Sequence, residues 1–151
     1  MKRAERIVMV QKVVDDLERR RAEALAASER QVAETQAKLA ELEAYRAGYI
    51  RDFSARAGAG MNAGSARDFQ TFLARLGEAL RQQSQIVVRA KAQRDSEHQI
   101  WQGAAQRANA VEHMAKRWNA EDQQELARRE QKETDDLSQR SWTYGMQPRG
   151  A

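Results

Sequence analysis

The residues able to carry acid–base or metal chemistry are few and widely spaced in this sequence. His98 and His113 are the only two histidines, and on one helix they would lie roughly 22 Å apart along the axis. Two histidines so far apart cannot share a metal ion within one chain. The adjacent carboxylate pairs, Asp15–Asp16 and Asp135–Asp136, diverge around a helix, because neighbouring helical residues do not face each other.

Motifs that activate a nucleophile or hold a phosphate are also missing. The chain has no cysteine, which excludes thiolate metal sites and a disulfide framework and fits a reducing compartment. It has no glycine-rich phosphate loop and no nucleophile elbow. A paired-helix rod also offers no enclosed pocket in which pKa values could be tuned. We therefore expect a protein that is not an enzyme, with no catalytic residues, no cofactor and no metal.

The amino-acid composition of the chain is typical of long helices. Of 151 residues, 32% are charged, 6% are aromatic and one is proline. Alanine, glutamate, arginine, glutamine and lysine dominate, and all of them favour helices. The apolar run from Ile7 to Val10 is cut short by Gln11 and Lys12, and no window reaches the ~20 apolar residues that span a bilayer. These features predict a soluble, cytoplasmic protein without membrane insertion.

Apolar side chains recur at alternating steps of three and four residues along two segments. This spacing is that of one helical face packed on a partner helix. It predicts an all-α fold, with one helix at about 3–53, a glycine-rich loop at about 54–64 and a second helix at about 65–140. Ser65 is the expected N-cap of the second helix. Residues 1–142 would form the hairpin, and residues 143–151 a disordered tail.

The two apolar stripes match each other in one antiparallel register. In an antiparallel hairpin, facing residues have numbers with a constant sum, and the pairing of Phe53 with Phe69 extends through both stripes. Between residues 17 and 25 the apolar stripe takes two consecutive steps of four residues, from 17 to 21 and from 21 to 25. Such a stutter locally unwinds a supercoil. The register sets Arg21 opposite Trp101 there, which suggests a cation–π stack. The predicted seam comprises Ile7, Val14, Leu17, Val32, Leu39, Phe53, Phe69, Leu73, Leu80, Val87, Trp101 and Val111.

Near the loop, the apolar surface is wider than one seam can bury. Tyr45, Phe72 and Ala79 are left beside the seam on a flank. One interpretation is a locally thicker core or a self-association patch. The other is a docking face for a second protein, because exposed aromatic surface rimmed by charge commonly marks interfaces.

Three stretches of this layout resemble the flagellar export protein FliJ family. They are YRAGYIRDF before the glycine loop, DFQTFLARLGEAL after it, and EQKETDDLSQR near the end. The resemblance extends over approximately residues 3–142. Lys38 and Gln83 stand at positions near the glycine loop where the family pattern leads us to expect other polar residues. Asp136 and Ser138 stand where glutamate and alanine are expected.

The resemblance implies a stalk-like component of the bacterial flagellar type III export apparatus, and so a place in flagellum biogenesis, protein transport and chemotaxis. Its implied partners are the hexameric export ATPase, the cytoplasmic domain of the export-gate protein FlhA, and export chaperones that it escorts. The location would be cytoplasmic, peripheral to the inner face of the cell membrane at the flagellar base. The gate-contacting strip carried over by position is Leu42, Tyr45, Tyr49, Phe72, Leu76 and Ala79.

The charge pattern leaves two further interpretations open. Residues 67–117 hold more basic than acidic side chains, so this stretch could bind nucleic acid, although a solvated face with interspersed ion pairs is the simpler interpretation. A generic structural coiled coil that self-associates is the other alternative. The stalk interpretation expects no nucleic-acid partner and a monomer when free. It also expects the ATPase to contact the charged faces near residues 19–21 and 117–129.

Overall fold

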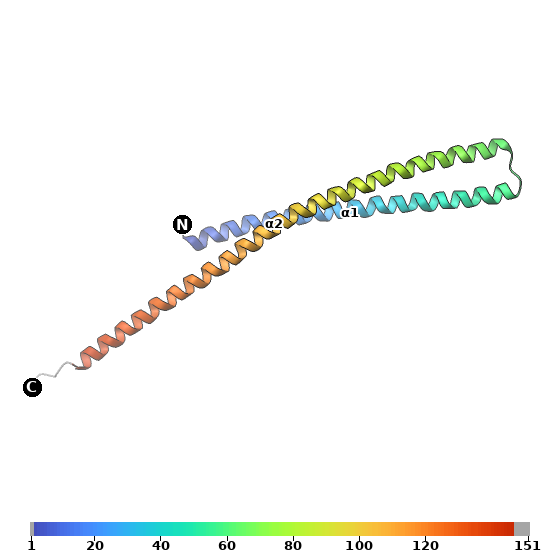
Figure 1. Cartoon of the computed structure of the whole chain (residues 1–151). Coiled ribbons are helices and arrows are strands. Elements are labelled where there is room, and N and C mark those ends of the chain that lie inside the picture. The colour runs from blue at the N-terminus through green and yellow to red at the C-terminus, as the bar shows by residue number, and fades with distance from the viewer. Residues whose placement is uncertain (1, 147–151) are drawn as a thin grey trace, which may run out of the picture. The chain divides into compact units, whose positions relative to one another are not determined.

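A computed structural model describes residues 2–146 of the chain and consists of two helices, α1 (Arg3–Gly58) and α2 (Ala63–Met146). The described residues contain no strand. Figure 1 shows the two helices side by side next to the turn that joins them, with the chain running toward the turn in α1 and away from it in α2. The predicted all-α fold of two long helices in an antiparallel hairpin is confirmed.

The chain divides into two compact units, and both helices contribute to each. The first, here called the hairpin unit, is Leu17–Ala104 and contains the turn. The second, here called the terminal unit, combines the residues up to Asp16 with those from Ala105 onward. The structure describes residues 2–16 and 105–146 of the terminal unit.

Both helices extend further than the sequence pattern predicted. α1 ends at Gly58 rather than near residue 53, so the predicted loop at 54–64 shrinks to residues 59–62. Residues 54–57 are serine, alanine, arginine and alanine, and alanine and arginine are strong helix formers that continue a helix without an apolar stripe. Arg56 lies in the last turn, where a cation interacts favourably with the helix dipole.

The second helix begins at Ala63, so the prediction of Ser65 as its N-cap is wrong. Asn62 takes that role, because its Oδ1 accepts a hydrogen bond of 2.8 Å from the backbone N–H of Ser65. This is the usual N-cap geometry, in which a side-chain oxygen satisfies a donor of the first turn. The turn before it contains Gly60 with φ of 96°, the left-handed region that glycine tolerates best.

At its other end, α2 reaches Met146, six residues past the predicted boundary. The predicted disordered tail at 143–151 is therefore wrong for residues 143–146, and residues 147–151 lie outside the described part. No proline precedes Pro148 to stop the helix. The Thr143 hydroxyl donates to the Gln139 carbonyl at 2.8 Å, one helical turn back.

The core of the hairpin unit is one narrow seam between the helices. Its buried residues include small and polar side chains as well as aliphatic ones. They are Ser28, Val32, Thr35, Phe69, Leu76, Leu80, Gln83, Val87, Ala90 and Ala104. Side chains with less than 2% exposure are absent from the described residues, as expected where each helix has only one partner.

Candidate functional site

The most concentrated non-polar feature of the hairpin unit is a group of five aromatic rings beside the turn, here called the aromatic cluster. Tyr49 lies at its centre, with ring centroids 4.5 Å from Phe72 and 4.7 Å from Phe69. Phe53 packs on Phe69 at 4.9 Å. Tyr45 stacks on Tyr49 at 6.4 Å and meets Phe72 edge-on at 6.2 Å. These spacings are within the range in which aromatic pairs add stability beyond their buried area.

Helix spacing explains why the rings meet. Tyr45, Tyr49 and Phe53 are four residues apart on α1, and Phe69 and Phe72 are three apart on α2. Residues at those separations share a helix face, so the antiparallel pairing brings the two faces together. The 4.9 Å contact of Phe53 with Phe69 is the pair that fixed the predicted register.

The cluster is only partly covered. Tyr45 is 57% exposed, whereas Ile50, which is 40% exposed, lies five residues further along α1 and therefore on a different side of the helix. Tyr49 and Phe72 are half-buried, as are Leu42 and Ala79. Leu76 is 7% exposed, so it belongs to the seam and presents little surface to a partner. Among the six gate-strip residues, Tyr45 presents the most accessible large side chain, and Ile50 was not among the predicted site residues.

A shallow hollow of about 310 Å³ lies next to the cluster, between the last turns of α1 and the first turns of α2. Tyr49 and Phe69 form its apolar side, and Asp52, Arg56, Ser65 and Asp68 its polar side. The Arg56 guanidinium lies 5.7 Å from the Phe69 ring centroid. Arg56 was not among the predicted site residues, although it lies three residues after Phe53 and therefore on the same helix face.

A charged pair marks the outer side of α2 a short way from the cluster. The Arg81 guanidinium donates from Nε to Glu78 Oε2 at 3.0 Å. This hydrogen bond, together with the positive charge of Arg81, lowers the pKa of the Glu78 carboxyl below its usual value. Both side chains are exposed, so the pair contributes charge to the surface and little to stability.

Farther from the turn, the seam contains two polar contacts between the helices. The Gln83 amide donates to the backbone carbonyl of Thr35 at 3.0 Å, and both residues are buried. The Trp101 indole N–H donates to Glu18 Oε1 at 2.8 Å. Polar pairs of this kind fix register, because any slip leaves a buried donor or acceptor unpaired.

The predicted Arg21–Trp101 stack is wrong. In the described part of the chain, cation–π contacts join Arg3 to Trp118 and Arg56 to Phe69, and none involves Trp101. Glu18 takes the indole instead, and Arg21 is exposed. A constant-sum register places residues along the helix axis but does not decide which neighbouring side chain reaches across.

All twelve predicted seam residues are at least partly covered. Ile7, Val32, Phe69, Leu80 and Val87 are buried. Those that are half-buried are Val14, Leu17, Leu39, Phe53, Leu73, Trp101 and Val111.

The described residues contain no group suited to metal chemistry. His98 packs its ring 5.8 Å from that of Trp101, and no set of three or more histidine, aspartate and glutamate side chains between residues 2 and 146 is placed to hold a metal ion. The helices of the described part also include none that is long and apolar enough to cross a membrane.

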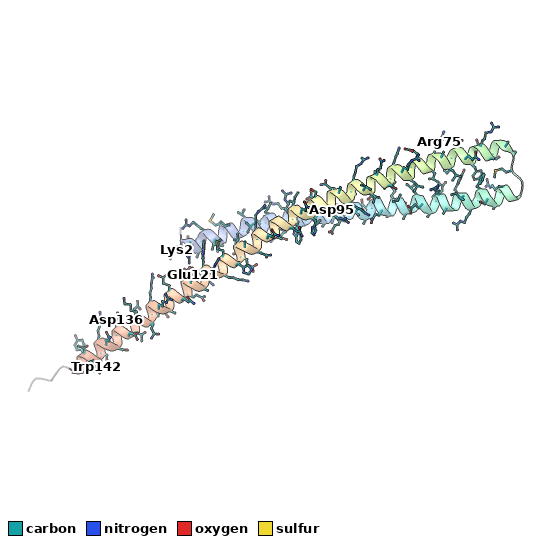
Figure 2. All side chains as sticks on the ribbon, viewed as in Figure 1. Lys2, Arg75, Asp95, Glu121, Asp136 and Trp142 are labelled. Atoms are coloured by element: carbon teal, nitrogen blue, oxygen red, sulfur yellow. The ribbon has the colours of Figure 1, made fainter. Side chains whose placement is uncertain are left out.

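In the terminal unit, an arginine ties the start of α1 to α2. Arg3 forms ion pairs with Glu121 at 3.4 Å and Asp122 at 3.0 Å, and its guanidinium lies 4.7 Å from the centroid of the Trp118 ring. Beyond these residues α2 has no covered side: every residue from 119 to 145 is exposed. Figure 2 shows side chains all round the helix near Asp136 and Trp142.

Comparison with known proteins identifies the family of the chain. No curated protein and no solved structure is found to match the chain. The family model described as "Flagellar FliJ protein" matches residues 3–146 and therefore covers both helices from end to end. The chain, a two-helix protein with an aromatic cluster beside its turn, belongs to the flagellar FliJ family.

Proposed function

We propose that this protein is a stalk-like coupling component of the flagellar export apparatus. Membership of the FliJ family makes it a component of flagellar protein export, and we propose that it acts there without catalysing a reaction. Within the export apparatus, its proposed role is that of a rod that binds both the hexameric export ATPase and the export gate. The same rod would escort export chaperones. Its location would be cytoplasmic, peripheral to the inner face of the cell membrane at the flagellar base.

The observation that supports gate docking is the partly exposed aromatic cluster beside the turn. Tyr45 is 57% exposed, and its ring packs against the rings of Tyr49 and Phe72. Large aromatic side chains on a preformed surface lose little entropy on binding and are common binding hot spots. We propose the cytoplasmic domain of FlhA as the protein that covers this surface.

The test is a binding measurement between the full-length protein and the cytoplasmic domain of the gate. Tyr45→Ala removes the most exposed ring of the cluster and should weaken binding by about 2 kcal/mol, or roughly thirtyfold, if the ring is a hot spot. Tyr144→Ala is the matched control, because Tyr144 is 80% exposed and lies in the terminal unit. If Tyr45→Ala keeps its helicity and binds the gate with unchanged affinity, the proposal that the gate docks on this surface is wrong.

For the ATPase, we propose that the charged face at residues 117–129 supplies the contact. These residues carry both signs of charge, and the ion pair Arg129–Glu125 at 2.8 Å is exposed. Contacts between exposed charges weaken as salt screens them. Co-purification with the ATPase should therefore fall as the salt concentration rises, and salt-independent binding would contradict a charged contact.

A further inference from the structure

The first turns of α1 carry more apolar surface than α2 can cover. Ile7 is 7% exposed and faces the seam. Val10, in contrast, is 46% exposed, Met9 58% and Val13 66%. Val13 lies three residues after Val10, so these two side chains share one flank of the helix, whereas Met9, two residues from Ile7, lies on the side that faces away from the seam. This flank belongs entirely to the terminal unit.

The flank borders a groove that is open along one side. The groove has a volume of about 450 Å³. Its floor is apolar, made by Ile7 and Val10 from α1 and by Val111, Met114 and Trp118 from α2. From Arg3 to Val10 it runs roughly 10 Å along α1, which is two turns of a helix. A groove between two parallel or antiparallel helices is the place where a third helix packs.

The edges of the groove are basic. Arg3 and Arg6 line it from α1. On α2, Arg107 lies two turns before Met114 on the same helix face, and Arg117 lies one turn after Met114, on the side of that residue away from the seam. Glu121 lies on the same face as Met114, but Arg3 already pairs with it. In the described part of the chain, none of the ion pairs involves Arg6, Arg107 or Arg117.

We propose that this groove docks an acidic amphipathic helix of a partner protein, with the apolar stripe of that helix on the floor and its carboxylates against Arg6, Arg107 and Arg117. Complementary charge around an apolar strip supplies both orientation and selectivity for such a helix. The groove lies in the terminal unit, so docking there is independent of whether the aromatic cluster binds the export gate. Arg117 and Trp118 also belong to the face at residues 117–129 proposed for the ATPase, so peptide binding is measured in the absence of the ATPase.

The probe is a designed helical peptide of about 20 residues, with leucine in one stripe and glutamate on both flanks. Its counterpart carries lysine at every glutamate position. Fluorescence anisotropy with the full-length protein should show saturable binding of the glutamate peptide and at least about tenfold weaker binding of the lysine peptide. Equal affinity for both peptides, or no binding of either, would overturn the proposal.

Two variants locate the binding site. Val10→Asp places a charge on the groove floor and should weaken binding of the glutamate peptide at least about tenfold. Its matched control is Val88→Asp, since Val88 is 66% exposed and lies in the hairpin unit. The double variant Arg6→Glu with Arg117→Glu changes only exposed side chains and should reverse the preference in favour of the lysine peptide. An equal loss in the Val88 control, or no reversal in the double variant, contradicts the assignment.

Sedimentation equilibrium tests whether a second copy of this chain, and not a partner helix, fills the groove. If the free protein forms a concentration-dependent dimer that Val10→Asp abolishes, the groove is a self-association surface and the proposal is wrong. A mass that stays monomeric from low to high micromolar concentration leaves the groove open to the partner helix.

Discussion

Gln83 shows how one polar side chain can constrain a long, simple seam. Its amide donates to the Thr35 carbonyl across the two helices, and it is 5% exposed. A hydrogen bond of this kind contributes only about 1 kcal/mol net, but leaving a buried group unpaired costs about 1–3 kcal/mol. The contact therefore acts less by adding stability than by making a shifted register unfavourable.

Gln83→Glu tests this contact without changing side-chain volume. The ionised carboxylate cannot donate to the Thr35 carbonyl, so the free energy of unfolding should fall by about 1–3 kcal/mol at neutral pH. Burial raises the pKa of the introduced acid, and its protonated form can donate. The loss should therefore shrink as the pH falls through that raised pKa. Urea unfolding at neutral and acidic pH measures it, with Gln85→Glu as the exposed control; equal losses in both variants would contradict the role of the hydrogen bond.

The Glu78–Arg81 pair allows a second test at single residues. Because the Arg81 guanidinium lowers the pKa of the Glu78 carboxyl, the pair contributes stability above the unfolded-state pKa and loses it as the pH falls through the folded-state pKa. Arg81→Ala should raise the pKa of Glu78 in an NMR titration while leaving the thermal midpoint nearly unchanged, since both side chains are exposed. Arg89→Ala is the control, and a pKa of Glu78 that does not move in Arg81→Ala would refute the assigned cause.

At the scale of the helices, the turn depends on one backbone conformation and one cap. Gly60 has φ of 96°, and a Cβ added there would meet no atom within 4 Å. The obstacle to another residue is therefore its backbone preference and not a lack of space. Asn62 then caps α2 through its contact with the Ser65 N–H. Both residues lie within the short segment 59–62 that reverses the chain.

Two glycine-to-alanine changes should shift stability in opposite directions. Gly60→Ala forces a side chain into the left-handed region and should lower the free energy of unfolding by about 1–2 kcal/mol. Gly77→Ala lies inside α2, where the Cβ would also meet nothing within 4 Å, and should raise it by about 0.5–1 kcal/mol. Chemical unfolding of the two variants checks the signs, and a shift in the same direction for both would show that something other than backbone preference decides.

The sequence predicted the elements better than it predicted their ends. The fold class was predictable because apolar side chains at steps of three and four residues indicate a helix packed on a partner helix. The register was predictable as well, since Phe53 and Phe69 are in contact. The ends were not, because residues 54–57 favour a helix without showing an apolar stripe, and because Asn62 and Ser65 are equally good N-caps by residue type.

The site was predictable only in part. The aromatic cluster follows from helix spacing, and the register already left Tyr45 on a flank, where it is 57% exposed. The gate strip was carried over by position from the family resemblance, and it therefore included Leu76, which is 7% exposed and belongs to the seam. The choice of Glu18 over Arg21 as the partner of Trp101 was not predictable, because it depends on how each helix is rotated about its own axis.

For the whole molecule, the uneven distribution of contacts predicts uneven stability. The hairpin unit contains the aromatic cluster and the buried seam from Val32 to Ala90. In the terminal unit, by contrast, residues 119–145 of α2 are exposed all round. Helical segments without a packed face are marginal in water, and Arg129–Glu125 is an exposed pair of the kind that contributes at most a few tenths of a kcal/mol.

Amide hydrogen exchange on the full-length protein should reveal this difference directly. The amides of Thr134 and Leu137, which lie in the exposed part of α2, should open with free energies of about 0–1 kcal/mol, whereas those of Val87 and Gln83 should approach the global value. Truncation after residue 122 removes no residue of the hairpin unit, so it should leave the slow amides and the thermal midpoint unchanged. Exchange at Leu137 as slow as at Val87 would show that the end of α2 is packed on another surface, either its own chain or a second copy, and the fraying prediction would then be wrong.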